Sequence, residues 1–154
     1  MALSTEKVIE ECNDLIRFDH DAIGAYDEAI DEIKESDIVE QLKVFRGDHQ
    51  RHVTDLSQIV RRLGGTPPEH PGVRGVIRKS MTKIAGLVGT EACLKAMRSN
   101  EEVLNKQYAQ RTNQQFPADV LQVIERNYQD EQRHLRYVEQ ALQSRLWEQH
   151  PAHP

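Results

Sequence analysis

The sequence is poor in the features that mark secreted, membrane or nucleic-acid-binding proteins. Its 154 residues contain two cysteines, and no apolar stretch is long enough for a signal peptide or a membrane span. The formal charge of −5 gives no concentrated basic surface for a nucleic acid or an anionic membrane. We therefore expect a cytoplasmic protein with reduced thiols, whose partners include no nucleic acid and no membrane.

Aromatic residues make up only 5% of the chain, and runs of β-branched residues are scarce. A β-sheet is built mainly from these residue types, so we expect an all-α fold packed through Leu, Ile and Ala. A chain of this length buries about 68–70% of its unfolded surface without disulfides, and residues 1–154 are predicted to form one domain. Cys12 and Cys93 are too isolated in the sequence to indicate a metal site.

Apolar residues recur at helical spacing in four segments. The predicted helices cover about residues 5–35, 37–63, 90–112 and 117–147. Ser4 or Thr5 supplies a hydroxyl cap for the first helix, and Asp37 with Glu40 predicts a capping box for the second. Pro117 suits the first turn of the last helix.

A single Pro/Gly-rich stretch separates the second helix from the third. Gly64-Gly65 predicts a left-handed end of the second helix, and Pro67-Pro68 prevents its continuation. We interpret residues 64–89 as a crossover that contains a short helix near 73–83 and runs along the length of the bundle. The first two helices are joined by a short turn, which makes them antiparallel.

The apolar face of the first helix is wider than a single packing seam requires. The additional apolar residues are Leu15, Phe18, Ala22, Ala25 and Ala29. This face could serve either a thick core or a contact with a second copy, and the sequence leaves both open. We expect a homo-oligomer, most simply a dimer.

Ionisable residues interrupt two of the apolar faces in a repeated arrangement. His49 and His52 lie in a stripe that otherwise consists of Ile38, Leu42, Phe45, Leu56, Ile59 and Leu63. Residues three apart on a helix lie about 5–6 Å from each other on one face, so both imidazoles can point to the same place. The last helix repeats the arrangement with Glu131 and His134.

Two more carboxylates, Asp19 and Glu101, lie on the apolar faces of the first and third helices. Asp19 precedes His52 by 33 residues, and Glu101 precedes His134 by the same 33 residues. A tyrosine follows each carboxylate by seven residues; these are Tyr26 and Tyr108. A helical rise of about 1.5 Å per residue brings the polar positions of all four helices to a common level. The predicted cluster consists of Asp19, His49, His52, Glu101, Glu131 and His134.

A buried cluster of this composition needs compensation for its charge. Three carboxylates removed from water repel one another, and each isolated buried charge costs several kcal/mol. Divalent cations would compensate them, and carboxylate with imidazole ligands suit iron, manganese or zinc. The alternative is that each residue is a hydrogen-bonded core residue. Glu102, which aligns with Arg98 rather than with Glu101, is predicted to be a surface ion-pairing residue.

The arrangement resembles the ferritin-like superfamily of di-iron and di-manganese carboxylate proteins, in which two helices each supply a Glu and two each supply Glu-x-x-His. The end of the second helix, Arg62-Leu63-Gly64-Gly65-Thr66-Pro67, is typical of these folds. More particularly, the sequence resembles an uncharacterised bacterial ferritin-like family. The resemblance lies in Gly72-Val-Arg-Gly75 with Arg78 and in Asn100-Glu101-Glu102. The resemblance implies a ferritin-like four-helix bundle with a non-haem metal centre. Members of the superfamily oxidise ferrous iron, reduce oxygen or peroxide, or store iron.

His49 departs from this pattern because the superfamily has a metal-bridging Glu at the corresponding position. Two divalent ions carry four positive charges, and three carboxylates neutralise only three of them. Four carboxylates would neutralise all four. Asp19 is also one methylene shorter than Glu. We therefore expect two iron ions, or one bound tightly and one weakly, with manganese or zinc as alternatives, and Tyr26 and Tyr108 orienting the ligands.

Two functions follow as hypotheses from the sequence. The first is a ferroxidase or an oxygen- or peroxide-reducing protein with a dinuclear centre. The alternative is a structural or stress-associated helical bundle without turnover, which holds a single zinc or iron ion or no metal.

Overall fold

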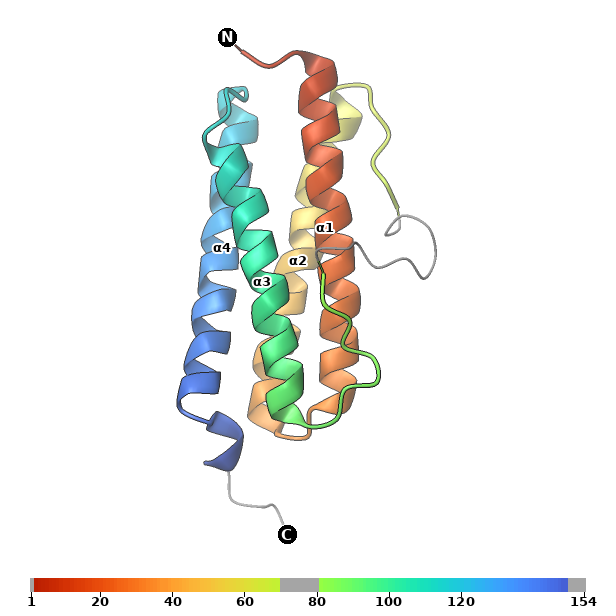
Figure 1. The fold of residues 1–154 in the computed structure, drawn as a ribbon. Coiled ribbons are helices and arrows are strands. Elements are labelled where there is room, and N and C mark those ends of the chain that lie inside the picture. Colours follow the sequence, from red (N-terminus) through yellow and green to blue (C-terminus); the bar gives the residue numbers. More distant parts are fainter. Residues whose placement is uncertain (1, 70–80, 150–154) are drawn as a thin grey trace.

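The computed structural model describes residues 2–69 and 81–149, which form four long α-helices and one short 3-10 helix. The elements are α1 (Thr5–Glu32), α2 (Ser36–Arg62), α3 (Thr90–Thr112), α4 (Ala118–Gln143) and η1 (Leu146–Glu148). No β-strand occurs within the described ranges. The helices α1 and α2 form one closely packed antiparallel pair, α3 and α4 form another, and the two pairs associate as a bundle (Figure 1). The predicted all-α four-helix bundle is confirmed.

The first helix begins where the sequence predicted but ends earlier. The Ser4 hydroxyl accepts a hydrogen bond from the backbone N–H of Lys7 at 3.1 Å and so caps α1. The helix ends at Glu32 rather than near residue 35, because Ile33 adopts extended backbone and its side chain joins the apolar core. The turn to α2 is therefore only three residues long, from 33 to 35.

The predicted capping box of α2 is wrong. Asp37 lies within the first turn of the helix, and Glu35 occupies the capping position without a side-chain cap hydrogen bond. The Glu35 carboxylate instead accepts a hydrogen bond from the hydroxyl of Thr90 at the start of α3. A tertiary contact thus determines this helix start. At the other end, Gly64 has the expected left-handed backbone, with φ of 89°.

The last helix also ends earlier than predicted, at Gln143 rather than near residue 147. Arg145 has left-handed backbone with φ of 49°, and η1 follows it. The Arg145 guanidinium lies 5.1 Å from the centre of the Trp147 ring and 2.6 Å from the Glu148 carboxylate. These contacts lie within residues 145–148, and the pair of Arg145 with Glu91 at 3.4 Å connects this segment to α3.

The crossover connects opposite ends of the bundle, so that α2 and α3 are parallel (Figure 1). The short helix predicted near 73–83 falls largely on residues 70–80, outside the described ranges, and residues 81–83 are not helical. The described part, 81–89, bonds to both neighbouring helices. The backbone N–H of Ala85 donates to Glu28 of α1 at 2.8 Å, and that of Thr82 donates to Asn100 of α3 at 2.6 Å.

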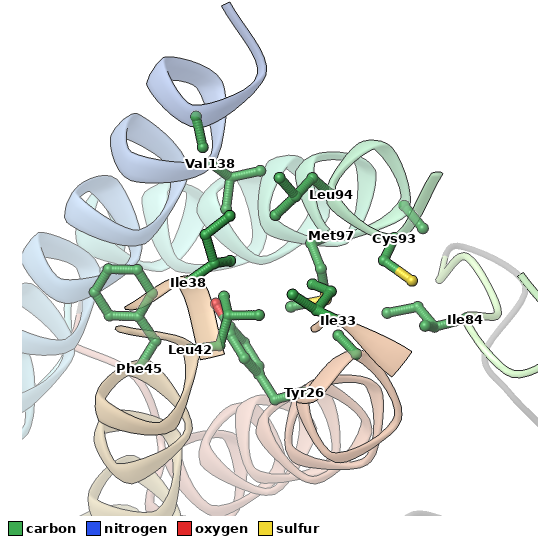
Figure 2. Packing of buried hydrophobic residues seen from close by; sticks show 13 residues of the cluster. Tyr26, Ile33, Ile38, Leu42, Phe45, Ile84, Cys93, Leu94, Met97 and Val138 are labelled. Carbon is green, nitrogen blue, oxygen red and sulfur yellow. The ribbon is translucent and has the colours of Figure 1, made fainter. Parts of the chain in front are cut away.

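The apolar core divides into two large clusters, one in each half of the bundle. One includes Ile33, Ile38, Leu42, Phe45, Ile84, Leu94, Met97 and Val138 (Figure 2). The other includes Val8, Cys12, Leu15, Ile16, Leu56, Val60, Phe116, Val120 and Ile124. The wide face of α1 is used inside the chain, since Leu15, Phe18 and Ala22 are all buried. It therefore serves the core, and the expected dimer loses its support from this face.

None of the helices in the described ranges is long and apolar enough to cross a membrane. The level between the two apolar clusters is instead polar, and it holds the cluster of ionisable residues.

Candidate metal centre

All four helices contribute to a buried polar cluster at the middle of the bundle. Asp19 comes from α1, His49 and His52 from α2, Glu101 from α3, and Glu131 and His134 from α4. Each of the six residues has a relative exposure of 0%. Their ligand atoms form two overlapping groups, within each of which all atoms lie within 4.8 Å of one another. The groups are Asp19, His49, His52 and Glu131, and His49, Glu101, Glu131 and His134.

The first group is arranged around the Asp19 carboxylate. Its Oδ1 lies 2.7 Å from Nδ1 of His49 and 3.1 Å from Nδ1 of His52. Oε1 of Glu131 lies 3.3 Å from Nδ1 of His49 and 3.4 Å from Nδ1 of His52. Four donor atoms thus face one another at distances that allow a single ion to be ligated.

The second group is held more loosely. Nε2 of His49 lies 3.4 Å from Oε1 of Glu101. Nδ1 of His134 lies 3.7 Å from the same oxygen and 3.6 Å from Oε2 of Glu131, which is too long for a hydrogen bond. His49 therefore presents a different ring nitrogen to each group, and Glu131 presents a different carboxylate oxygen to each.

Among the described residues, four ligand atoms of this cluster are buried and have no partner within hydrogen-bond geometry, only the longer ion-pair contacts given above. They are Oε2 of Glu101, Oε1 and Oε2 of Glu131, and Nδ1 of His134. Buried polar atoms without a partner are rare because each costs the free energy of its lost hydration. These are the atom types that divalent transition metals bind, so the residues present fit a metal ion.

Two tyrosines support the carboxylates across the bundle. The Tyr26 hydroxyl, on α1, donates to Oε1 of Glu101 on α3 at 2.6 Å. The Tyr108 hydroxyl, on α3, donates to Oδ2 of Asp19 on α1 at 2.5 Å. Burial and the adjacent carboxylates raise the pKa of both tyrosines well above the usual value, so they remain neutral donors. Each tyrosine therefore orients the carboxylate of the opposite helix.

Two aspartates that were not among the predicted site residues bind the outer nitrogens of two histidines. Oδ2 of Asp48 lies 2.8 Å from Nε2 of His134, and Oδ2 of Asp130 lies 2.9 Å from Nε2 of His52. Each carboxylate fixes the ring orientation of a histidine on the other helix, which leaves Nδ1 directed into the cluster.

Arginines hold these aspartates from the solvent side. Arg133 donates to Oδ2 of Asp48 at 2.5 Å, and Arg51 donates to Oδ2 of Asp130. The same arginines also lie 3.0 Å and 3.4 Å from the aspartate on their own helix. Arg51, Arg133, Asp48 and Asp130 form a quartet of ion pairs between α2 and α4, which we call the α2–α4 quartet.

A sequence signal for the aspartates exists. Six positions of the first helix pair, those of the cluster, its tyrosine and the quartet, recur 82 positions later: 19 and 101, 26 and 108, 48 and 130, 49 and 131, 51 and 133, 52 and 134. The stretch Asp48-His49-Gln50-Arg51-His52 thus corresponds to Asp130-Glu131-Gln132-Arg133-His134. Extending the repeat by one residue would have identified both aspartates. Glu102, as predicted, is an exposed partner of Arg98 at 3.8 Å.

Opposite charges determine the protonation of the metal-free cluster. Burial by itself would lower the pKa of His49, but Glu131 and Asp19 outweigh it and raise the pKa to about 9. Burial also lowers the pKa of His134, and Asp48 with Glu101 raises it to about 11. Against the effect of burial, His52 and His49 lower the pKa of Asp19 to about 2. In the metal-free protein, protonated imidazoles therefore balance the negative charge of the carboxylates, as metal cations would.

The metal-free protein should lose stability as the pH rises from about 6.5 to 9. The pKa of His49 is raised from 6.5 to about 9 on folding, so its stabilising contribution is complete below pH 6.5, declines between pH 6.5 and 9, and is lost above pH 9. Melting temperatures of chelator-treated protein across this range provide the measurement. A His49→Gln variant should show a flatter profile, and a wild-type melting temperature that stays constant or rises would contradict the assignment.

Solved structures similar to this chain share the ferritin-like fold. A ferritin-like, diiron-carboxylate protein from Bacillus anthracis str. Ames is 19% identical, with a TM-score of 0.73 over 92% of this chain and 99% of that one. A dodecameric thioferritin, the bacterioferritin-related protein from Bacteroides fragilis, is 14% identical, with a TM-score of 0.82 over 95% and 91%. At these identities the likeness establishes the fold: the protein is a ferritin-like four-helix bundle.

The chain belongs to the family described as "Domain of unknown function (DUF2383)", whose model matches residues 7–114. A search of curated proteins finds no match. The matched range includes α1, α2 and α3 but stops before α4. Glu131 and His134, on α4, are therefore placed by the fold of this chain rather than by the family match.

Proposed function

We propose that the buried cluster binds divalent metal ions, with iron as the first candidate and manganese or zinc as alternatives. The observation that carries this proposal is the set of four buried ligand atoms that have no hydrogen-bond partner among the described residues and that all belong to one cluster of three carboxylates and three imidazoles. A core designed only for packing would pair these atoms or replace them with apolar groups, because orphaned buried polar atoms destabilise the fold.

The residues divide into two half-sites. Asp19 and His52 supply ligands to one, Glu101 and His134 supply ligands to the other, and the shared residues contribute to both. Asp130 and Asp48 keep the outer ring nitrogens of the two unshared histidines occupied. Tyr26 and Tyr108 hold one oxygen of Glu101 and of Asp19, so each carboxylate has its other oxygen for an ion.

As the activity, we propose slow oxidation of ferrous iron by oxygen or peroxide. A redox-active ion in the centre would supply the electron transfer to the oxidant. The protein's contribution is a water-poor site between two apolar clusters with preoriented carboxylates, in which charge is stabilised more strongly than in water. The ferritin-like, diiron-carboxylate description of the Bacillus anthracis structure supports iron as the ion to test first.

The two half-sites should differ in affinity. One half retains the Glu and Glu-x-x-His set, as Glu101, Glu131 and His134. The other half has Asp19, which is one methylene shorter than Glu, and His49, which stands where the superfamily has a carboxylate. Supporting this, His49 lies 2.7 Å from Asp19 in one group and 3.4 Å from Glu101 in the other, so as a metal ligand it would contribute to both half-sites without the negative charge of a carboxylate. We expect one ion to bind tightly and a second more weakly, with the tight ion in the half that contains Glu101 and His134.

The test is metal analysis and calorimetric titration of protein prepared without a histidine tag. Tight binding of one ferrous or cobalt ion per chain, with a second weaker phase, would support the proposal. Binding that is unchanged by Glu131→Gln would contradict it. Binding without any oxidation above the rate in buffer would favour the structural bundle over the oxidising protein.

His49→Glu should increase affinity for the second, weaker ion. The substitution restores a fourth carboxylate, which neutralises the charge of two divalent ions and removes one positive charge from a buried site. We expect at least a tenfold decrease in the weaker Kd, which corresponds to about 1.4 kcal/mol. The same titration measures it, with Glu102→Gln on the surface of α3 as a control. Equal affinities in the wild-type protein would contradict the asymmetry.

A further inference from the structure

The α2–α4 quartet is the polar connection between the buried cluster and solvent. The side chains of Asp48 and Asp130 are each 11% exposed, and those of Arg51 and Arg133 are 44% and 47% exposed. Within the described ranges, no other solvent-exposed side chain has a hydrogen bond to the side chain of a candidate ligand, since Tyr26 and Tyr108 are buried. Among the described residues, the quartet therefore forms a hydrogen-bonded connection from the surface to the cluster.

The other sides of the bundle are more closed. The pairs α1–α2 and α3–α4 pack closely along their lengths, and α2 and α4 approach each other least of the four neighbouring pairs. The side formed by α1 and α3 carries residues 81–89, which bond to Glu28 and Asn100. Among the described helices, the seam between α2 and α4 is thus the least closely packed of the four.

We propose that metal ions enter and leave the centre along this seam, with Asp48 and Asp130 as receiving carboxylates and Arg51 and Arg133 as a displaceable plug. The inference rests on the proposed metal binding and adds the route of uptake. In the closed arrangement each carboxylate is neutralised by a guanidinium on the opposite helix. A divalent cation at the same carboxylates replaces that charge, so exchange of guanidinium for metal leaves the quartet balanced.

The arginines are suited to this exchange by their exposure. The guanidinium groups of Arg51 and Arg133 are half-exposed, so water can solvate each of them when it leaves its aspartate. The aspartates, in contrast, are fixed by the buried histidines behind them, at 2.8 Å and 2.9 Å. Opening therefore requires only that the two arginine side chains swing outward, without a movement of the helices.

The test compares rates of cobalt(II) uptake and release in the wild type and in Arg51→Gln/Arg133→Gln. Removal of two cationic groups from the route should accelerate uptake about tenfold, the lower end of the effect that local charge has on association rates. Release into excess chelator should accelerate by a similar factor, because a plug is a barrier common to both directions. Kd should accordingly change only a few-fold. Cobalt absorbance in stopped flow follows both rates.

Arg126→Gln is the matched control. Arg126 pairs with Asp55 at 2.7 Å across the same two helices, and it lies seven residues before Arg133 on α4, about 10 Å along the axis. Its loss should leave both rates unchanged. The single variants Arg51→Gln and Arg133→Gln, each expected to give a partial acceleration, keep the test valid if the double variant folds poorly.

Four results would overturn the inference. Rates in the double variant equal to those of the wild type would show that the route lies elsewhere. Faster release with unchanged uptake and a weaker Kd would show that the arginines only position the ligands. An equal acceleration in Arg126→Gln would show that any loosening of the seam suffices. A wild-type protein that takes up no cobalt would refute the proposed metal binding itself, and this inference with it.

Discussion

Glu131→Ala should oxidise ferrous iron no faster than buffer, whereas Asp19→Ala should retain part of the wild-type rate. Glu131 is the one carboxylate that belongs to both ligand groups, and both of its oxygens are buried without a hydrogen-bond partner. Its loss removes an anionic ligand from each half-site. Asp19 belongs to one group only, and that half-site is expected to be the weaker. The measurement is the growth of near-ultraviolet absorbance after apo-protein is mixed with ferrous iron and oxygen or peroxide.

Glu102→Ala serves as the control for this experiment. Glu102 is exposed on α3, next in sequence to Glu101, and pairs with Arg98 rather than with the cluster. Its removal should leave the rate at the wild-type value. If wild type, Glu131→Ala and buffer all give the same rate, the oxidising activity is refuted and metal binding without turnover is left. Equal rates in Glu131→Ala and Asp19→Ala, both above buffer, would refute the central role of Glu131.

Removal of metal by a chelator should lower the melting temperature of the wild type by about 5–10 °C. An ion that binds only the folded bundle stabilises it by about 2.7 kcal/mol at a free concentration 100-fold above Kd. For a chain of this size, each kcal/mol corresponds to about 2–4 °C. The expected shift is large because the cluster joins all four helices, so its ligands come together only in the folded state.

The variant His52→Ala/His134→Ala should show hardly any difference between chelated and metal-supplemented samples. It lacks the unshared histidine of each half-site, while Asp19, Glu101 and Glu131 remain as charged groups. Thermal melts by circular dichroism, with and without chelator, provide the comparison. An unmoved wild-type melt would show that the cluster is not a metal site that stabilises the bundle. A shift of equal size in the double variant would show that the metal binds elsewhere.

The helices and the polar positions of the cluster could be predicted from the sequence because both are periodic. Leu42, Phe45, His49 and His52 follow one helical face, and the structure buries all four. The 33-residue spacing between Asp19 and His52 and between Glu101 and His134 predicts a common level, and the ligand atoms of these residues do lie in the two compact groups. Helix rise converts sequence distance into height, so this level did not depend on tertiary detail.

Ends of elements were predicted less well where long-range contacts determine them. The capping box predicted for the start of α2 is absent. Glu35 occupies the capping position there, and its carboxylate bonds to Thr90, 55 residues away. The end of α4 was misplaced because Arg145 leaves the helix with left-handed backbone and pairs with Glu91 of α3 at 3.4 Å, 54 residues away. Local patterns describe neighbours along the chain, and these contacts are not among them.

By itself, the sequence determined the helical class, the antiparallel pairing of α1 with α2, the long crossover and the six residues of the cluster, since each depends on period and spacing. Only the tertiary structure decided how the helices face one another. It alone assigned Tyr26 to Glu101 and Tyr108 to Asp19, gave His49 a separate nitrogen for each group, and placed Asp48 and Asp130 behind histidines of the opposite helix. The physical reason is that helical spacing fixes the height and face of a side chain on its own helix. The partner across the bundle depends on the relative rotation and distance of two helices, which all the packed side chains determine together.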